Sequence, residues 1–433
     1  MDVSVDDFYG NIPHQISSLT YLERIQTSSR NHPSDGILAS HLVFVSYLQC
    51  TALEITQFPA SKLVQVIIQL TTWKVYTKTW EGITCNQNGW IIQLRLPSKG
   101  LKGGIFPSSL GNLKLLSHLN LSHNLLSGSL EAGMSLSLSH LEILDLSYNL
   151  FSGEVALSLS SSYIQTVDLS SNQFNGTIPS SFLQHSWNLS SFNVSNNHFT
   201  SQIPSLICLR FSSLRVLDFS HNNFSGSIPL GLGNCSELEV FRAGDNTLSR
   251  SLPADIYKAQ ALQEISLSTN SLFGPIGENV GKLSKLKLMH LHYNNLEGHL
   301  PPSLMNCTNL VEIKLRFNRF SGNISALDFS KLTQLSKLDF INNMFTGILP
   351  ISLYSCKSLK ALQLAANYFE GQIQPEILQL KNLTFLSLSN NRLTNVTGAM
   401  NILTSLKSLK VLLSKVFAGE EMPDGDITLI KEQ

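Results

Sequence analysis

Apolar and polar positions along residues 117–393 follow a pattern that returns every 23 to 25 residues. Each copy ends on an asparagine, and apolar residues stand eight, five and three positions before it with few exceptions; Leu310, Ile313 and Leu315 precede Asn318 in this way. Because strand side chains alternate between two faces, the last two apolar positions predict a short strand with one buried face. One copy cannot bury its own apolar row, so we expect the copies to stack as coils of a solenoid. The twelve asparagines are Asn124, Asn149, Asn172, Asn197, Asn222, Asn246, Asn270, Asn294, Asn318, Asn343, Asn367 and Asn391.

A second pattern follows each asparagine. Phe or Leu stands two residues after it, glycine stands four residues after it in nine of the twelve copies, and several copies continue with an Ile-Pro or Leu-Pro pair. Glycine adopts backbone conformations that other residues avoid, and proline fixes φ and removes a donor on the outer side of the coil. The Phe and Leu column predicts a packing spine rather than a binding stripe. Ser201 and Arg250 replace the glycine, and we expect those coils to bulge slightly.

The full pattern, LxxLxLxxNxFxGxIP, resembles the plant-type leucine-rich repeats of receptor kinases and receptor-like proteins. The resemblance implies an α/β repeat solenoid, a horseshoe or superhelix with a parallel inner β-sheet and a 3-10 or irregular outer side. The asparagine amide carries two donors and an acceptor. We expect it to bond to backbone groups that the turn leaves unpaired, in its own coil and in the next one.

The array has less regular segments on both sides. Residues 73–90 resemble an incomplete N-terminal cap of the same family, on Thr79-Trp80-Glu81-Gly82-Ile83-Thr84-Cys85. No cysteine stands just before Trp80, so Cys50 is the alternative partner for Cys85 if the intervening chain folds back. Residues 91–426 are assigned to the solenoid, whose first coil has Lys99 in the asparagine position. Residues 427–433 are expected to be a frayed tail.

Residues 1–72 are interpreted as an atypical leader. Phe8-Tyr9-Gly10-Asn11-Ile12-Pro13, with Leu19 and Leu22, matches the tail of a repeat, and beyond that the register fails. We interpret the segment as a relic of a neighbouring repeat gene joined to this one, or as the product of a mis-assembled gene model. The alternative is an ordinary disordered or partly helical leader. Residues 1–7 carry three acids and no bases, so we expect no ordinary secretory signal. The longest apolar stretches, near 37–48 and 63–70, are too short to span a bilayer.

Charge and cysteine usage narrow the functional class. The chain has 30 basic and 30 acidic residues, and without a basic surplus we expect no nucleic-acid partner. Cys235, Cys307 and Cys356 each stand thirteen residues after their asparagine and share one position on their coils. Cys307 and Cys356 are two coils apart, beyond the reach of a disulfide, and all three are predicted to be buried free thiols. Cys208 lies elsewhere in its coil.

No constellation of residues predicts catalysis or a cofactor. His290 and His292 share a coil, but no acid, cysteine or third histidine stands in register beside them, so solvated inner-face residues are favoured over a metal site. The glycines belong to the repeat and not to a phosphate-binding loop. The kinase signatures of the family's intracellular half are absent from the sequence. We therefore expect a protein that is not an enzyme.

The variable residues between the leucine positions point to the concave face and are the candidate binding residues. Charged groups with aromatic rings suit an extended peptide, because cations bind carboxylate or sulfate and rings contact apolar side chains. For each single residue, a merely solvated face is an equal alternative. The candidates are Arg242, Asp245, Glu264, Ser266, His290, His292, Tyr293, Lys314, Arg316, Phe317, Asp339 and Gln363.

Four segments sharpen the family resemblance: 238–244, 300–308, 325–330 and 393–399 are similar to the ectodomains of plant receptors for tyrosine-sulfated peptides. This subfamily comprises the phytosulfokine receptors and the tyrosine-sulfated glycopeptide receptor, and the resemblance covers roughly residues 79–426. It implies a peptide ligand, possible tyrosine sulfation of that ligand, growth signalling at the plasma membrane, and a co-receptor kinase of the somatic-embryogenesis type. The family's island insertion, membrane helix and kinase have no counterpart in this sequence, which therefore resembles a truncated receptor.

Ten Asn-x-Ser/Thr sequons fit a secreted glycoprotein, and we expect only some of them to be used. Asn120 and Asn193 are predicted to lie on inner strands. Two alternatives to the receptor ectodomain remain: a soluble interaction protein, such as an enzyme inhibitor or decoy, and an inactive truncated gene product. The sequons are Asn120, Asn175, Asn188, Asn193, Asn223, Asn234, Asn306, Asn323, Asn382 and Asn395.

Overall fold

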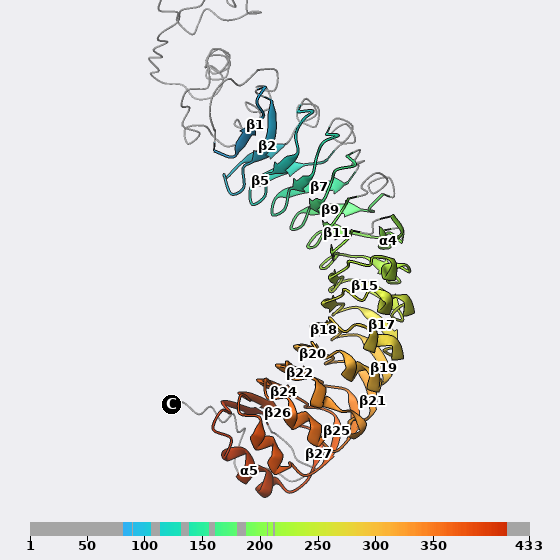
Figure 1. The fold of residues 1–433 in the computed structure, drawn as a ribbon, viewed down its shortest axis with the longest axis vertical. Coiled ribbons are helices and arrows are strands. Elements are labelled where there is room, and N and C mark those ends of the chain that lie inside the picture. Colours follow the sequence, from blue (N-terminus) through green and yellow to red (C-terminus); the bar gives the residue numbers. More distant parts are fainter. Residues whose placement is uncertain are drawn as a thin grey trace, which may run out of the picture.

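The computed structural model describes residues 81–88, 90–104, 113–130, 138–155, 161–179, 188–205, 207–210 and 213–413. These residues form a curved solenoid (Figure 1), as the repeat pattern predicts. The leader at 1–72 with its Cys50, residues 73–80 and 89 of the cap segment, and the tail at 427–433 lie outside the described residues. Predictions about those segments stay predictions.

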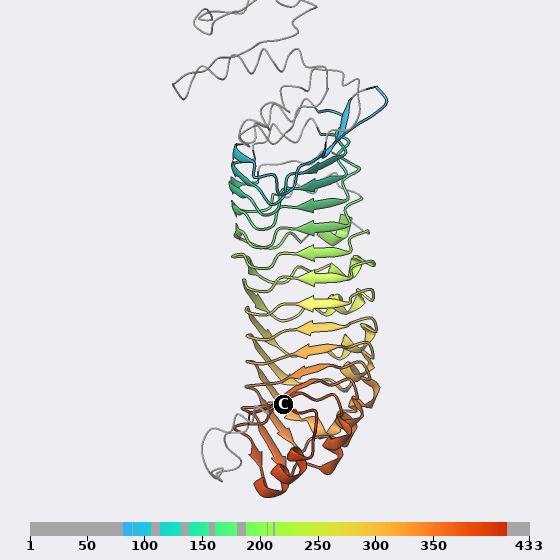
Figure 2. The ribbon, with the colours of Figure 1, turned by 90° about the vertical axis from the view of Figure 1, so that its left-hand side faces the viewer.

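A single inner sheet of fifteen strands runs along the described solenoid, and Figure 2 shows its strands stacked one above another. Neighbouring strands pair in parallel, except that β1 pairs antiparallel with β2 through Ile83 and Leu94. This strand covers the first edge of the sheet, the role expected of a cap. In order, the strands are β1 (Ile83–Cys85), β2 (Ile91–Arg95), β4 (His118–Asn120), β6 (Ile143–Asp145), β8 (Thr166–Asp168), β10 (Ser191–Asn193), β12 (Val216–Asp218), β14 (Val240–Arg242), β16 (Glu264–Ser266), β18 (Leu288–His290), β20 (Glu312–Lys314), β22 (Lys337–Asp339), β24 (Ala361–Gln363), β26 (Phe385–Ser387) and β28 (Val411–Leu413).

The segment after each asparagine forms a second row of strands, which the sequence pattern did not predict. One sheet holds β3 (Lys102–Gly104), β5 (Leu125–Gly128), β7 (Leu150–Glu154), β9 (Gln173–Gly176) and β11 (His198–Phe199). Another holds β13 (Ser225–Gly226), β15 (Thr247–Arg250), β17 (Ser271–Gly274), β19 (Asn295–His299), β21 (Arg319–Asn323), β23 (Met344–Gly347), β25 (Tyr368–Gly371) and β27 (Arg392–Leu393). Between the two sheets, the described pairing is a single bridge from Gln202 to Ser225.

The convex side of the solenoid carries mostly 3-10 helices, as the family resemblance implies (Figure 1). Several begin directly after a proline, whose fixed φ suits a helix start. The coil after Asn391 instead contains an α-helix, and Asn395 caps it by accepting a hydrogen bond from the Gly398 N–H. The helices are α4 (Ile207–Arg210), η7 (Leu232–Asn234), η8 (Ala254–Lys258), η9 (Glu278–Lys282), η10 (Pro302–Asn306), η11 (Ile324–Ala326), η12 (Phe329–Lys331), η13 (Ile351–Ser355), η14 (Pro375–Gln379) and α5 (Val396–Thr404).

The repeating asparagine links each coil to the one before it. The Asn343 side-chain N–H groups donate to the Leu315 carbonyl of the preceding coil at 3.0 Å and to the Phe340 carbonyl of its own coil at 3.1 Å. Its side-chain oxygen accepts from the Phe320 N–H at 3.0 Å. All twelve asparagines make this set of bonds, which confirms their predicted role.

The phenylalanine column forms a buried spine, as predicted. Phe151, Phe174, Phe199 and Phe224 stack in sequence with ring centroids 6.0 to 6.2 Å apart. A second run continues from Phe320 through two further coils at 6.2 and 6.3 Å. These rings are fully buried. Each coil therefore buries its ring against the next coil, which is how a solenoid closes a core.

The two glycine replacements behave differently from the predicted bulge. Arg250 adopts φ 73° and Ser201 adopts φ 72°, in the range that the neighbouring glycines occupy. Arg250 keeps its place in the ladder and pairs with Leu272, so the prediction of a bulge is wrong for that coil. The second row of strands is interrupted beside Ser201, where only the Gln202 bridge connects the two sheets. Left-handed backbone at a residue with a side chain costs roughly 1–2 kcal/mol.

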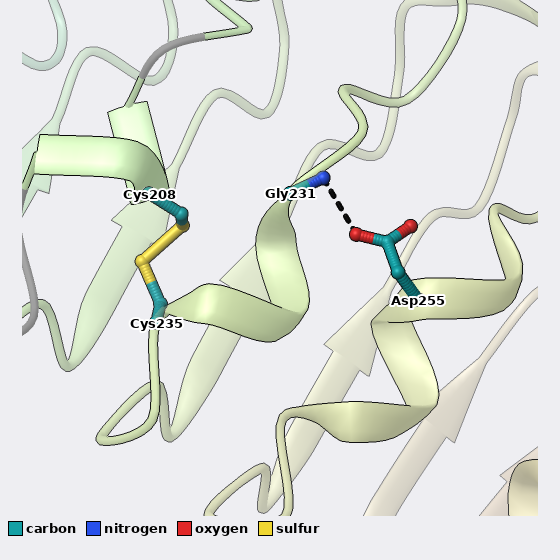
Figure 3. The surroundings of a disulfide bond; sticks show 4 residues. All are labelled: Cys208, Gly231, Cys235 and Asp255. Atoms are coloured by element: carbon teal, nitrogen blue, oxygen red, sulfur yellow. Dashed lines mark hydrogen bonds between the residues drawn. A yellow bond between two sulfur atoms is a disulfide. The ribbon is translucent and has the colours of Figure 1, made fainter.

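Cys235 is not a free thiol, which corrects the prediction. It forms a disulfide with Cys208 of the preceding coil, and the two Cα atoms lie 5.0 Å apart (Figure 3). The one-turn helix α4 places Cys208 beside Cys235, which directly follows η7 in the next coil, and the repeat spacing did not reveal this proximity. Cys307 and Cys356 are buried free thiols, as predicted, and burial raises the pKa of each to about 12.

Candidate ligand-binding face

The register of the inner sheet places the third residue of each strand in one column, named here the inner column. In β12 to β26 it consists of Asp218, Arg242, Ser266, His290, Lys314, Asp339, Gln363 and Ser387. These strands line the inner side of the curve (Figure 1). The column therefore brings residues 24 or 25 positions apart in sequence next to one another on neighbouring strands.

In the N-terminal part of the column, the polar groups satisfy one another. Asp145 and Asp168 each accept hydrogen bonds from the backbone and hydroxyl of the serine two residues later. Their remaining oxygens accept from the amides of Asn120 at 2.9 Å and Asn193 at 3.0 Å. Burial raises the pKa of Asp168. This part of the column is a structural ladder with its acceptors filled.

Arg242 is held by acids on both neighbouring strands. Its Nε and one terminal nitrogen donate to the two carboxylate oxygens of Glu264 at 2.7 and 2.6 Å. Its other terminal nitrogen lies 3.5 Å from Asp218 Oδ2. The hydrogen bonding of Arg242 to the Glu264 carboxylate is the main reason that the pKa of Arg242 is raised. Arg242 therefore already uses, in its contact with Glu264, the pair of nitrogens that it would otherwise offer to an anion.

Glu312 joins the next two members of the column. Its carboxylate lies 2.6 Å from Lys314 Nζ and 3.2 Å from His290 Nε2. Burial, followed by the charge of Lys314, lowers the pKa of His290, so the imidazole is neutral at pH 7. Lys314 thus has its charge balanced within the face.

The coils from β18 to β24 contain a different arrangement, named here the C-terminal patch and made of His292, Tyr293, Arg316, Phe317, Asp339 and Gln363. Arg316 Nε lies 3.8 Å from Asp339 Oδ2, and neither atom forms a hydrogen bond with any described residue. His292 Nδ1 and Gln363 Oε1 are likewise buried without a partner among those residues. Buried polar atoms are ordinarily paired, so four of them on successive coils need an explanation.

Two exposed rings complete the C-terminal patch. Tyr293 and Phe317 stack with centroids 4.6 Å apart and remain 42% and 38% exposed. The Arg316 guanidinium carbon lies 5.2 Å from the centre of the Tyr293 ring. Burial, followed by the charge of Arg316, lowers the pKa of His292 to about 4, so that ring is neutral. The patch offers one cation, flat apolar surface and unpaired polar atoms.

Asp339 is distinguished from the other aspartates of the column. Asp145, Asp168 and Asp218 each have a serine hydroxyl two residues later, whereas Asp339 has Ile341 there. Asp339 accepts one long hydrogen bond, from the Ile341 N–H at 3.4 Å, and is 1% exposed. Burial raises its pKa. It is a carboxylate that the solenoid itself leaves partly unsatisfied.

The remaining predicted binding residues form fewer contacts with other residues of the face. Asp245 lies at the strand end, 3.5 Å from His221, and its backbone shares the left-handed conformation of Tyr293 and Phe317. Ser266 lies in the inner column at half-buried exposure. His290 and His292 have ring centroids 6.2 Å apart, and no group of three or more metal-ligating side chains occurs in the described part of the chain. No described residue set assembles a metal site.

Sequence reasoning missed several charged residues of this face, among them Asp218 and Lys337. Asp218 contacts Arg242, and Lys337 opens β22 at half-buried exposure. Both occupy the variable positions between apolar residues, so the repeat register contained the signal that would have identified them. The repeat register did not predict which charged residues pair with each other, because ion pairs across the sheet depend on which side chains are long enough to reach the neighbouring coil.

The sequons divide into two groups. Asn120 and Asn193 lie on β4 and β10, as predicted, and are half-buried. The other eight asparagines are exposed. None of those eight belongs to a strand of the inner sheet.

Comparison with known proteins shows which families and proteins the sequence resembles. The Leucine Rich Repeat family model matches residues 140–162, 163–184, 188–209, 213–235 and 285–307. Phytosulfokine receptor 1 of Arabidopsis thaliana is 42% identical over 78 residues, which cover 18% of this chain and 8% of the relative. The receptor-like serine/threonine-protein kinase RGI4 of the same plant is 34% identical over 89 residues, which cover 20% of this chain and 8% of the relative.

Solved structures agree over most of the chain. The ectodomain of the Arabidopsis receptor kinase HAESA, in complex with an N-terminally extended IDA peptide hormone, has a TM-score of 0.61 at 25% identity, covering 82% of this chain and 69% of that one. The chain is a leucine-rich-repeat solenoid of the plant receptor-kinase ectodomain type. The GASSHO1/SCHENGEN3 ectodomain from Arabidopsis thaliana, in complex with CASPARIAN STRIP INTEGRITY FACTOR 2, has a TM-score of 0.56 at 29% identity, covering 75% of this chain and 44% of that one.

The two similar ectodomains were each solved in complex with a ligand. The matches of this chain span well under two thirds of the length of the curated relatives. Among the described residues, no helix has the length and hydropathy needed to cross a membrane.

Proposed function

We propose that the chain is the ligand-binding part of a plant cell-surface receptor and that it recognises an extended peptide on its concave face. The observation that carries this proposal is the C-terminal patch, where the partly exposed guanidinium of Arg316 lies beside two exposed, stacked rings. A peptide with an anionic group and an apolar side chain would pair with the exposed end of Arg316 and cover the rings. The similar HAESA ectodomain, which was solved with a peptide hormone ligand, supports the same class of ligand.

The proposal includes a location outside the cell. The eight exposed sequons and the disulfide between Cys208 and Cys235 both suit the oxidising secretory route. Tyrosine sulfation of the ligand and a role in growth signalling extend the proposal by resemblance to the phytosulfokine receptors. Arg242 and Lys314, which the sequence offered as sulfate partners, already have acidic partners within the face.

Binding of short synthetic peptides to the purified full chain tests the proposal, with each peptide prepared both with and without a sulfated tyrosine. Calorimetry is expected to detect binding that is lost in Gln363→Trp, because the bulky side chain projects from β24 into the hollow face within the C-terminal patch. The matched control is Lys258→Trp on the convex helix η8, which is expected to bind normally. Equal binding by both variants, or no binding by the unaltered chain at high micromolar concentration, would overturn the proposal.

We further propose a co-receptor kinase of the somatic-embryogenesis type as a partner. One solved structure of similar fold contains HAESA with its peptide hormone and the co-receptor SERK1. Size-exclusion chromatography of the chain with a purified co-receptor ectodomain tests this partner. Co-elution only when the binding peptide is present is the expected result, and separate elution with peptide bound would exclude it.

A further inference from the structure

Three arginine and lysine side chains were predicted to bind ligand, and they differ in what they already contact. Arg242 donates two short hydrogen bonds to Glu264, and Lys314 lies 2.6 Å from Glu312. The Arg316 side chain forms no hydrogen bond with any described residue; its nearest acid contact is the 3.8 Å separation of Nε from Asp339 Oδ2. A cation whose terminal nitrogens are unpaired can form new charge-assisted hydrogen bonds without first breaking old ones.

The surroundings of Arg316 fix the plane and position of its guanidinium. Tyr293 lies on one side, with its ring centre 5.2 Å from the guanidinium carbon, and buried Asp339 lies behind Nε. The side chain as a whole is 37% exposed although Nε is buried. The exposed part therefore lies beyond Nε, where the terminal nitrogens form the fork that matches a carboxylate or a sulfate.

The two rings beside Arg316 are not required by the fold. Tyr293 and Phe317 both adopt φ 55°, directly before a repeat asparagine. Ser171, Thr269 and Ala366 occupy the same position with nearly the same φ. Small side chains thus serve the backbone equally well, whereas large apolar rings at a third or more exposure are unfavourable in water. A ring or other flat apolar group from a ligand would cover them.

We propose that Arg316 binds an oxyanion of the ligand, a carboxylate or an ester sulfate, carried next to a ring that packs on Tyr293 and Phe317. This inference rests on the proposed function and deepens it by assigning the anion to Arg316 rather than to Arg242 or Lys314. The oxyanion accepts hydrogen bonds from the terminal nitrogens of Arg316. The neighbouring His292 is neutral and adds no competing charge.

Three small probes and the full chain test the assignment: the amide of N-acetyl-O-sulfotyrosine, N-acetylphenylalanine with its free carboxylate, and the neutral amide of N-acetyltyrosine. Binding is followed by ligand-observed NMR titration at low salt. At least one anionic probe is expected to bind about tenfold more tightly than the neutral one, since hydrogen bonds to charged groups are worth roughly 1.5–3 kcal/mol. Which anion binds better identifies the source as sulfate or carboxylate.

Variants separate Arg316 from the other cations. Arg316→Gln is expected to remove the preference for the anion, and Phe317→Ala to weaken all three probes severalfold. Arg319→Gln is the matched control, because this exposed arginine lies three residues away on β21 and undergoes the same change. Circular dichroism confirms folding of each variant.

The assignment is overturned if Arg316→Gln keeps the anion preference, if Arg242→Gln abolishes it instead, or if no anionic probe binds better than the neutral one. These outcomes differ from failure of the proposed function. Peptides that still bind to the concave face, with an affinity indifferent to Arg316→Gln, would leave the receptor proposal intact and remove only this assignment.

Discussion

Single residues in this solenoid carry backbone strain that the repeat pattern locates. The three copies without the repeat glycine have Ser201, Arg250 and Asn395 at that position, and all three adopt positive φ. Asparagine tolerates the left-handed region better than the other two residues. Arg250 is exposed and forms no ion pair with any described residue, so its side chain contributes little to offset the strain.

Arg250→Gly is expected to stabilise the chain by roughly 0.5–1 kcal/mol. The change removes left-handed strain of about 1–2 kcal/mol and adds part of the unfolded-state entropy of glycine. Urea unfolding monitored by circular dichroism measures the difference. Arg250→Ala is the control, because alanine retains the strain and is expected to give no gain. Equal stabilisation by both changes would show that the arginine side chain, rather than φ, is the unfavourable feature.

The buried carboxyl group of Asp339 predicts that the stability of the folded protein depends on pH. Burial raises its pKa above the ordinary value, so the folded protein binds this proton more tightly than the unfolded chain does. The contribution of Asp339 to stability therefore becomes less favourable as pH rises through its folded pKa. Asp339→Asn is expected to raise stability at pH 7 by about 1 kcal/mol, and the gain is expected to shrink as pH falls toward 4.

Thermal unfolding of both proteins across pH 4 to 7 measures this effect. A gain that does not change with pH would mean that the carboxylate charge is not its cause. A loss of stability at pH 7 would mean that attraction from Arg316, Lys314 and Lys337 outweighs the cost of burial.

At the scale of elements, the asparagine ladder adds polar links between coils to the apolar contacts of the continuous core. Each asparagine satisfies a backbone N–H of the preceding coil and carbonyls of both coils, as Asn343 does for Phe320 and Leu315. Adjacent coils are thus joined by side-chain bonds as well as by strand pairing. The ladder is expected to fail locally when one member is removed, because each coil contacts only its neighbours.

Asn343→Leu is expected to destabilise the solenoid by about 2–4 kcal/mol, since it leaves several buried backbone groups without partners. Hydrogen exchange is the suitable measurement, because it locates the loss. Faster exchange is expected at the Phe320 amide and in β22. The control is Asn342→Gly at the exposed neighbouring residue. Asn342 has a positive φ that glycine adopts readily, so this change is expected to leave the stability unchanged. Unchanged exchange in Asn343→Leu would contradict the role of the ladder.

The sequence predicted the inner strands and the contacts that recur in every coil, but not the second row of strands or the contacts that occur in single coils. The apolar spacing located the inner strands, the asparagine ladder and the phenylalanine spine, because each depends on a residue type that recurs at a fixed position. The second row of strands was missed because its central glycine is typical of turns. The disulfide was missed because Cys208 lies outside the repeat register. The pairing of Arg242 with Glu264 required the strand register and side-chain reach.

At the scale of the whole molecule, the exposed sequons leave the hollow side clear. Asn234 and Asn306 belong to convex 3-10 helices, and Asn175 and Asn323 belong to the second row of strands. On the inner sheet, the amides of Asn120 and Asn193 donate to Asp145 and Asp168 and are therefore engaged. A glycan on either amide would disrupt that ladder.

Secretory expression of the chain in plant cells, followed by glycopeptide mass spectrometry, is expected to find Asn120 and Asn193 unoccupied. Glycans are expected only among the eight exposed sequons: Asn175, Asn188, Asn223, Asn234, Asn306, Asn323, Asn382 and Asn395. High occupancy at Asn120 or Asn193 would contradict the pairing of these amides in the inner column.

The central claim is that the concave strands from β18 to β24 form the binding surface. Hydrogen–deuterium exchange of the full chain, with and without a peptide selected on it from a random display library, tests this claim most directly. The account predicts slower exchange in segments 288–294, 312–318, 337–343 and 361–367, with the convex helices η9 to η14 unchanged. Protection confined to the convex helices or to the second row of strands would contradict it.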